Sequence, residues 1–164
     1  MRKKSPITLN RRWKLEMDKF KIGGLGGTFD RLHDGHKMLI STAFKVADRV
    51  AIGLSTDALL ANKKDKDMIQ SYDERAKAIE EFITEGLKLP KTSFAIFPLN
   101  DLFGDTITSE ELEIHISSEE TFEGAKKINE IRLKKGLKPL NLLMIPLVTK
   151  EKGQKISSTD IREE

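Results

Sequence analysis

Two histidines, His33 and His36, stand three residues apart shortly after a pair of glycines that ends with Gly27. A helix that begins at these histidines would present unpaired backbone N–H groups and the positive end of its dipole, a combination that binds phosphate. The glycines would let a phosphate approach the backbone closely. The two imidazoles would lie on one face of the helix, where both can donate to phosphate oxygens. The pattern predicts a phosphate-binding turn, with Asp34 as the N-cap of the helix.

Two less specific interpretations of the histidines stay open. They could be ordinary surface residues of a helix, or they could bind zinc. A zinc site needs a third histidine, cysteine or carboxylate, and the sequence contains no cysteine. The stretch is also not the glycine fingerprint of dinucleotide-binding proteins, because Phe29 stands where that fingerprint needs its last small residue. We therefore expect no metal ion held by the protein's own residues.

The elements that must position this turn follow from the hydrophobic pattern. A short apolar run predicts a buried strand over about 21–26, and 37–47 predicts an amphipathic helix. The alternation along the chain predicts one α/β domain: a Rossmann-like, doubly wound parallel sheet of about five strands with right-handed crossovers. Further strands are predicted over 49–54, 93–97 (ended by Pro98), 112–117 and 140–148, and further helices over 72–88 and from Ser118 to Gly136.

Length and composition fit a cytoplasmic enzyme that acts on small phosphorylated molecules. The 164 residues suffice for one domain with a proper core. The net charge of +3 suits such substrates and does not argue for nucleic acid. No apolar run approaches the roughly 20 residues that span a bilayer, so we expect no membrane partner. We divide the chain into a basic, solvated leader, 1–19, and a domain, 20–164; the oligomeric state stays open, a monomer included.

Two lysines and an arginine outside the turn are candidates for weaker reasons, and a third histidine is not a candidate. Lys63 and Lys64 follow the second predicted strand, and ligands of open α/β sheets bind at the carboxyl ends of strands, although a lysine-rich loop is most often only solvated. Arg75 fits a ligand contact or a structural ion pair equally well. His115, inside the fourth predicted strand, is expected to be a packed or surface residue.

A second helix start stands near the end of the sequence. Ser157, Ser158 and Thr159 offer hydroxyls and backbone amides to anionic oxygen, and Arg162 follows one turn later as a fork for phosphate. On its own such a run is a common N-cap. Together with the first turn it predicts two helix ends that hold one triphosphate from opposite sides.

These stretches resemble a known family over about residues 20–162. Gly-Gly-Thr-Phe-Asp-x-x-His-x-Gly-His, residues 26–36, resembles the first signature of the nucleotidyltransferases with an HxGH motif. Ile-Ser-Ser-Thr-x-Ile-Arg, residues 156–162, resembles their second signature. The element Ser-Glu-Glu-Thr…Gly…Ile-Asn-x-x-Arg, residues 118–132, is similar to the archaeal and eukaryotic type of phosphopantetheine adenylyltransferase in particular.

The resemblance implies a reaction. It implies transfer of the adenylyl group of ATP to 4′-phosphopantetheine, giving dephospho-coenzyme A and pyrophosphate, with Mg²⁺ carried by ATP. The first signature fits cytidylyltransferases and FAD synthetases of the same superfamily nearly as well, so these stay as alternatives. A nucleotide-binding module without catalysis is an alternative of another class.

The resemblance also implies roles for single residues. His36 and His33 would donate to ATP phosphate oxygens, with His36 stabilising the transition state. Lys63 or Lys64 would bridge the acceptor and the α-phosphate, and the hydroxyl of Thr28 would bind the acceptor phosphate. The other implied substrate contacts are Gly27, Phe29, Arg75, Ser157, Ser158, Thr159 and Arg162.

Overall fold

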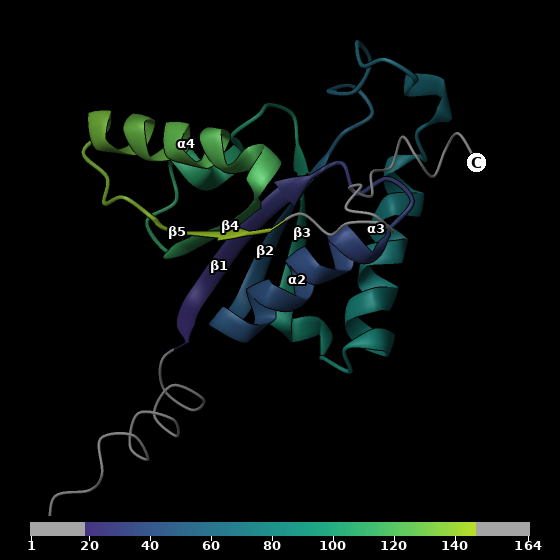
Figure 1. The fold of residues 1–164 in the computed structure, drawn as a ribbon, viewed down its shortest axis with the longest axis horizontal. Helices are drawn as coiled ribbons and strands as arrows, with labels where there is room; N and C mark the ends of the chain where they lie inside the picture. Colours follow the sequence, from purple (N-terminus) through teal and green to yellow (C-terminus); the bar gives the residue numbers. More distant parts are fainter. Residues whose placement is uncertain (1–18, 147–164) are drawn as a thin grey trace, which may run out of the picture.

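Five parallel strands form one sheet in the order β3-β2-β1-β4-β5 (Figure 1). The computed structural model describes residues 19–146. The first strand, β1, lies in the middle of the sheet. The next strands add first on one side of it and then on the other, so the predicted doubly wound fold is confirmed. The strands are β1 (Phe20–Gly27), β2 (Ala47–Ser55), β3 (Phe94–Leu99), β4 (Ile114–Ser118) and β5 (Asn141–Ile145).

Helices lie on both faces of the sheet (Figure 1). α2 (Asp34–Val46) and α3 (Tyr72–Glu81) pack on one face, and α3 continues as a π-helical turn, Phe82–Gly86. α4 (Phe122–Lys134) contacts β4 and β5 from the other face, where a second, smaller apolar cluster forms. Short 3-10 segments lie at Lys66–Met68, Lys91–Ser93, Gly104–Ile107 and Glu119–Thr121.

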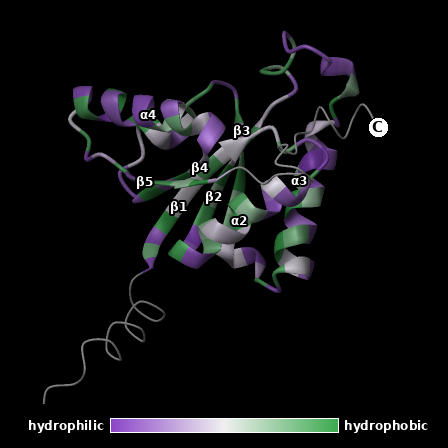
Figure 2. Cartoon of the chain, in the orientation of Figure 1, coloured by the Kyte–Doolittle hydropathy of each residue, from purple (hydrophilic) through white to green (hydrophobic). Residues whose placement is uncertain are grey.

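The main core lies between the sheet and the α2 and α3 helices. Alternate residues of a strand point to the same side, so Val50, Ile52 and Leu54 of β2 all face this core and are at most 2% exposed. Figure 2 shows apolar segments both on the strands and on the helices that cover them. Replacing Ile52 by Ala would empty a site with no solvent exposure, at a cost of roughly 2–5 kcal/mol.

One predicted strand end is wrong. Pro98 does not end the third strand, because β3 continues to Leu99 with Pro98 opposite Leu54 of β2. β3 is an edge strand, and an edge strand tolerates a residue without an N–H on the side that has no neighbour.

The apolar spacing of α4 predicts a buried side made of Phe122, Ala125, Ile128, Ile131 and Leu133. Ala125 and Ile128 are buried as predicted, but Leu133 is 61% exposed and Arg132 is buried in its place. Gly136 ends the helix as predicted, with a positive φ of 78° and a hydrogen bond from the N–H of Leu137 to the carbonyl of Arg132.

No helix within residues 19–146 is long and apolar enough to cross a bilayer.

Candidate active site

The predicted phosphate-binding turn lies at the carboxyl edge of the sheet. β1 ends at Gly27, the turn follows, and α2 starts at Asp34. β1 is also where the sheet order changes direction, since its neighbours are β2 on one side and β4 on the other. In open α/β sheets this switch point is where ligands bind.

The two histidines fix the start of α2 themselves. His33, not the predicted Asp34, is the N-cap: its Nδ1 accepts a hydrogen bond from the N–H of Gly35 at 3.1 Å. In return, the N–H of His33 donates to Nδ1 of His36 at 3.4 Å. The rings stack with their centroids 3.7 Å apart and an interplanar angle of 20°. The sequence pattern missed this because Asp is a common N-cap, whereas an imidazole rarely takes that position.

This arrangement determines the tautomer of both rings. Each Nδ1 accepts a backbone N–H, so each neutral imidazole carries its proton on Nε2. Burial and, to a smaller extent, the neighbouring His33 lower the pKa of His36 to about 3, while Asp30 opposes the shift. At neutral pH the His36 ring is therefore an uncharged donor through Nε2–H.

The backbone of the turn is strained. Phe29 and Arg31 have positive φ values of 51° and 46°, a conformation that costs roughly 1–2 kcal/mol for a residue with a side chain. Neighbouring groups impose it: the ring of Phe29 is 2% exposed and lies 5.3 Å from that of His36, centroid to centroid. The N–H of Arg31 donates to Oε1 of Gln70 at 2.9 Å, and the N–H of Gln70 donates to Oδ1 of Asp30 at 2.9 Å.

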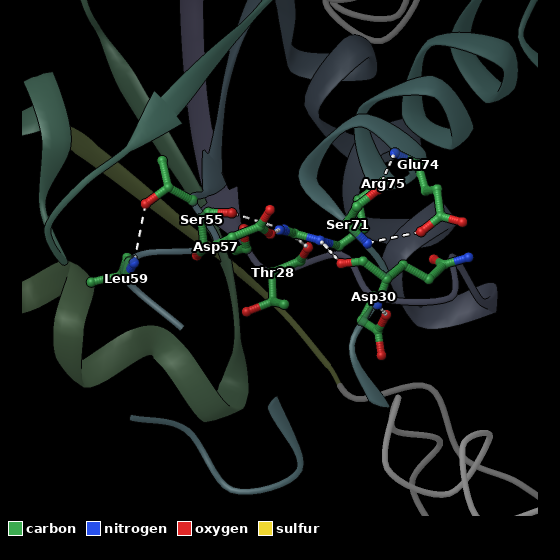
Figure 3. A network of polar contacts seen from close by, with 11 residues as sticks. Thr28, Asp30, Ser55, Asp57, Leu59, Ser71, Glu74 and Arg75 are labelled. Atoms are coloured by element: carbon green, nitrogen blue, oxygen red, sulfur yellow. Dashed lines mark hydrogen bonds and ion pairs between the residues drawn. The ribbon is translucent and has the colours of Figure 1, made fainter. Parts of the chain in front are cut away.

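Arg75 ties the turn to the ends of two strands (Figure 3). Its guanidinium has no solvent exposure and donates to the carbonyl oxygens of Thr28, Ser55 and Gln70, each at 2.9 Å, and to Oδ1 of Asp57 at 3.0 Å. These contacts favour the structural alternative for Arg75, and a direct contact with substrate stays a prediction.

A capping box holds the helix that carries Arg75. The hydroxyl of Ser71 accepts from the N–H of Glu74 at 3.2 Å, and the carboxylate of Glu74 accepts from the N–H of Ser71 at 2.9 Å (Figure 3). α3 therefore starts at a defined residue, which places Arg75 one turn inside the helix.

Lys63 and Lys64 lie in the segment between β2 and α3. Both are exposed, and Figure 1 shows this segment extending from the carboxyl edge of the sheet. Their position is compatible with the predicted contact to phosphate, but nothing in the geometry distinguishes one lysine from the other.

A groove of about 1020 Å³ opens on the α4 side of the sheet. Its floor is flat because it consists of residues with small side chains or none. A Cβ atom on Gly53 would come within 2.8 Å of Leu99, so any larger residue there would displace the side chain that covers it. The floor residues are Gly24, Gly26, Ala51 and Gly53; the walls are the β3–β4 connection, with Leu102, Phe103 and Leu112, and the start of α4, with Thr121, Gly124 and Ile128.

The element over 118–132 builds the wall of this groove. Arg132 is 2% exposed and donates to the carbonyl oxygens of Thr106 (2.6 Å), Ser109 (2.8 Å) and Lys138 (2.8 Å). It thereby ties the β3–β4 connection to α4. A charged residue on the apolar stripe of a helix was the available signal for this role.

Asn129 fastens the same element to the sheet. Its amide donates to the carbonyl of Leu140 at 2.9 Å and accepts from the N–H of Leu140 at 2.7 Å. The helix predicted from Ser118 begins with the 3-10 turn Glu119–Thr121, which Ser118 precedes, and the hydroxyl of Ser118 lies 3.3 Å from that of Thr121.

Several predicted features lie outside the described residues. They are positions 1–18 of the predicted leader over 1–19, the last two positions of the predicted strand over 140–148, Ser157, Ser158, Thr159 and Arg162. The meeting of two helix ends around one triphosphate therefore stays a prediction.

Comparison with known proteins gives a family. The cytidylyltransferase-like family model matches residues 25–164. The phosphopantetheine adenylyltransferase of Methanopyrus kandleri is 39% identical over 146 residues, which are 89% of this chain and 91% of that protein. The protein of the same name from Saccharomyces cerevisiae is 40% identical over 90% of this chain, but the chain spans only 49% of it.

A solved structure agrees with the fold. A protein of unknown function from Archaeoglobus fulgidus superposes with a TM-score of 0.67 and is 27% identical, over 84% of this chain and all of that one. The chain belongs to the phosphopantetheine adenylyltransferase family, within the cytidylyltransferase-like proteins.

Proposed function

We propose that this chain transfers the adenylyl group of ATP to 4′-phosphopantetheine, giving dephospho-coenzyme A and pyrophosphate. The observation that carries the proposal is the pair of imidazoles at the start of α2, at the carboxyl edge of the sheet from which an apolar groove leads away. The edge suits the phosphates of both substrates, and the groove suits the chain of the acceptor. The names of the curated relatives support the same acceptor.

The reaction needs no protein nucleophile. An oxygen of the acceptor phosphate attacks the α-phosphorus of ATP, the bond from that phosphorus to the bridging oxygen breaks, and pyrophosphate leaves with the electron pair. The acceptor phosphate is already ionised at neutral pH, so no general base is required. The protein contributes positioning and stabilisation of the charge that develops on the transferred group and on pyrophosphate.

The proposed donors to the phosphates of ATP are the ring N–H groups of the two histidines. Nε2–H of His36 and of His33 would donate to phosphate oxygens of ATP, and their Nδ1 bonds hold the rings in place. The hydroxyl of Thr28 would bind the acceptor phosphate. Lys63 or Lys64 would supply positive charge between the two phosphates.

Mg²⁺ enters the proposal with ATP. Among residues 19–146, no group of three or more histidine, aspartate or glutamate side chains is placed to hold a metal ion. Mg²⁺ commonly binds substrate phosphates and keeps several waters, so we assign it no protein ligand. When bound, it would neutralise part of the triphosphate charge.

The groove is proposed to hold the pantetheine chain. Its floor follows β1 from Ile22 to Gly27, roughly 16 Å at ~3.3 Å per residue. The lining is mainly apolar, which suits a long chain of methylene and methyl groups interrupted by two amides and a hydroxyl. We further propose that the enzyme works in the cytoplasm on these small molecules.

Release of pyrophosphate tests the function. The chain would be incubated with ATP or CTP and, in turn, 4′-phosphopantetheine, glycerol 3-phosphate, choline phosphate or FMN. We expect release only with ATP plus 4′-phosphopantetheine. Release with CTP or with FMN would indicate another transferase of the superfamily, and nucleotide binding without any release would indicate a module without catalysis.

A further inference from the structure

His115 lies on the groove side of β4. In the register of the sheet it stands opposite Gly24 of β1, which is part of the groove floor. Its chain neighbours Ile114 and Ile116 point the other way, into the core that faces α2. The imidazole itself lines the groove.

The hydrogen-bonding capacity of this imidazole is unused within the described residues. Nδ1 is buried and has no hydrogen-bond partner among residues 19–146. A neutral imidazole has one donor and one acceptor nitrogen. A proton on Nδ1 would be buried without a partner, which is costly, whereas a proton on Nε2 can be received by whatever fills the groove. The ring therefore presents Nε2–H to the groove.

The chemistry of the ring limits what it can bind. Burial lowers the pKa of His115 to about 4, so the ring is uncharged at neutral pH. An uncharged donor in an apolar groove is suited to an uncharged acceptor such as an amide carbonyl. The neighbouring wall residues Leu112 and Ile128 offer no competing oxygen from their side chains.

We propose that His115 is a specificity-determining residue of the acceptor groove, and that its imidazole N–H donates to an amide carbonyl of the pantetheine chain. The inference rests on the proposed function. It names His115 as the group that distinguishes this acceptor from phosphorylated molecules without amides. A phenyl or aliphatic side chain would fill the same place and leave the carbonyl of the chain unpaired.

Steady-state kinetics of His115→Phe and His115→Gln test the proposal. Phe keeps the ring and removes the donor, and the side-chain amide of Gln can place an N–H close to the position of Nε2. We expect His115→Phe to raise KM for 4′-phosphopantetheine roughly 3- to 10-fold, with KM for ATP and kcat unchanged. His115→Gln should recover most of the loss. Titration calorimetry with 4′-phosphopantetheine alone should show the same change in Kd.

Ser117 supplies a matched control. It lies two residues along on the same side of β4, is 3% exposed, has no hydrogen-bond partner for its hydroxyl within residues 19–146, and is not part of the groove lining. Ser117→Ala should leave both KM values unchanged. If His115→Phe does not fold, His115→Leu takes its place as the variant without a donor.

The outcomes separate this inference from the proposed function. If the wild-type protein is active and the folded His115→Phe variant has an unchanged KM for the acceptor, the inference is overturned and the proposed function is not. An equal rise in both KM values would also overturn it, because a purely structural role predicts that result. A wild-type protein that neither binds 4′-phosphopantetheine nor releases pyrophosphate with it overturns the proposed function, and the inference with it.

Discussion

Arg75 and Arg132 are both buried, and each fastens a loop of the site to a helix. Arg75 holds the turn after β1 that leads to α2, which we call the phosphate edge. It does so through the carbonyls of Thr28 and Ser55 and an ion pair with Asp57, whose own side chain is 65% exposed. Arg132 holds the groove wall through three carbonyl oxygens, and no carboxylate within residues 19–146 forms an ion pair with it.

The two arginines hold the two halves of the site through separate partners. Within residues 19–146, the hydrogen bonds of Arg75 and those of Arg132 share no residue. Both arginines bind three carbonyl oxygens, but the turn held by Arg75 contains two residues with positive φ and Arg75 adds an ion pair with Asp57. We therefore expect variants of the edge to affect the chemical step and ATP, and variants of the wall to affect the acceptor.

The largest expected effect is on the chemistry of the phosphate edge. His36→Asn places an amide oxygen near the position of Nδ1, so it can still accept from the N–H of His33, but it removes the Nε2–H donor. We expect kcat/KM for pyrophosphate release to fall about 10²- to 10³-fold, as for loss of one transition-state donor. The circular dichroism spectrum and melting temperature should stay close to wild type. Undiminished turnover in this variant would remove His36 from the mechanism.

Replacing Arg75 or Arg132 by methionine should weaken the kinetics toward a different substrate in each case. Both variants leave buried carbonyl oxygens without donors, so each should lose about 2–4 kcal/mol in the free energy of unfolding measured with urea. Arg75→Met should also lower kcat or raise KM for ATP, and Arg132→Met should raise KM for the acceptor. If both variants changed both substrates equally, the two halves would not be independent.

Acid should destabilise the fold through His36 and His115, one in each half. Burial lowers their pKa values to about 3 and about 4, whereas the unfolded chain titrates near 6.5. The unfolded chain therefore takes up protons that the folded chain does not, and stability is lost as the pH falls below 6.5. Between pH 7 and pH 5.5 each histidine should cost about 1 kcal/mol.

Urea unfolding at these two pH values measures the effect. His115→Gln should lose about half of the combined contribution of the two histidines, because only His36 remains. The same pH dependence in wild type and in His115→Gln would mean that His115 is not shielded from water.

The smallest effect concerns a glycine inside α4. A Cβ on Gly124 would meet no atom within 4 Å, and Gly124 lines the groove. Gly124→Ala should raise stability by up to about 1 kcal/mol through helix propensity, and the new methyl group should raise KM for the acceptor a few-fold. Gly136→Ala is the control: its Cβ also meets nothing, but its φ of 78° makes the change destabilising by about 1 kcal/mol. If the Gly124→Ala enzyme is more stable and its KM for the acceptor is unchanged, the acceptor does not contact the start of α4.

The fold could be predicted because its signals are local. Apolar runs of strand length, glycines before a helix start, and Gly136 in the left-handed conformation each act within a few residues. The end of β3 at Leu99 was not predictable in that way, since whether a proline interrupts a strand depends on whether the strand lies at the edge of the sheet.

The site was predictable only where sequence neighbours form it. The imidazole pair at the start of α2 follows from spacing. The burial of Arg132 does not, because it depends on carbonyl oxygens of Thr106 and Ser109, more than twenty positions earlier in the chain. Nothing in the sequence pattern indicated that Gln70 binds the turn after β1, because that turn lies about forty residues earlier in the chain.

The hydrogen bonds inside the imidazole pair also make metal coordination by these rings less favourable. Zinc, nickel and copper bind an imidazole nitrogen that carries no proton. In both rings Nδ1 is occupied by a backbone N–H, and vacating Nε2 would move its proton onto Nδ1, directly against that N–H. Coordination through Nε2 would therefore cost a ring its hydrogen bond with the backbone at the start of α2, and this cost disfavours transition-metal binding at the histidine pair.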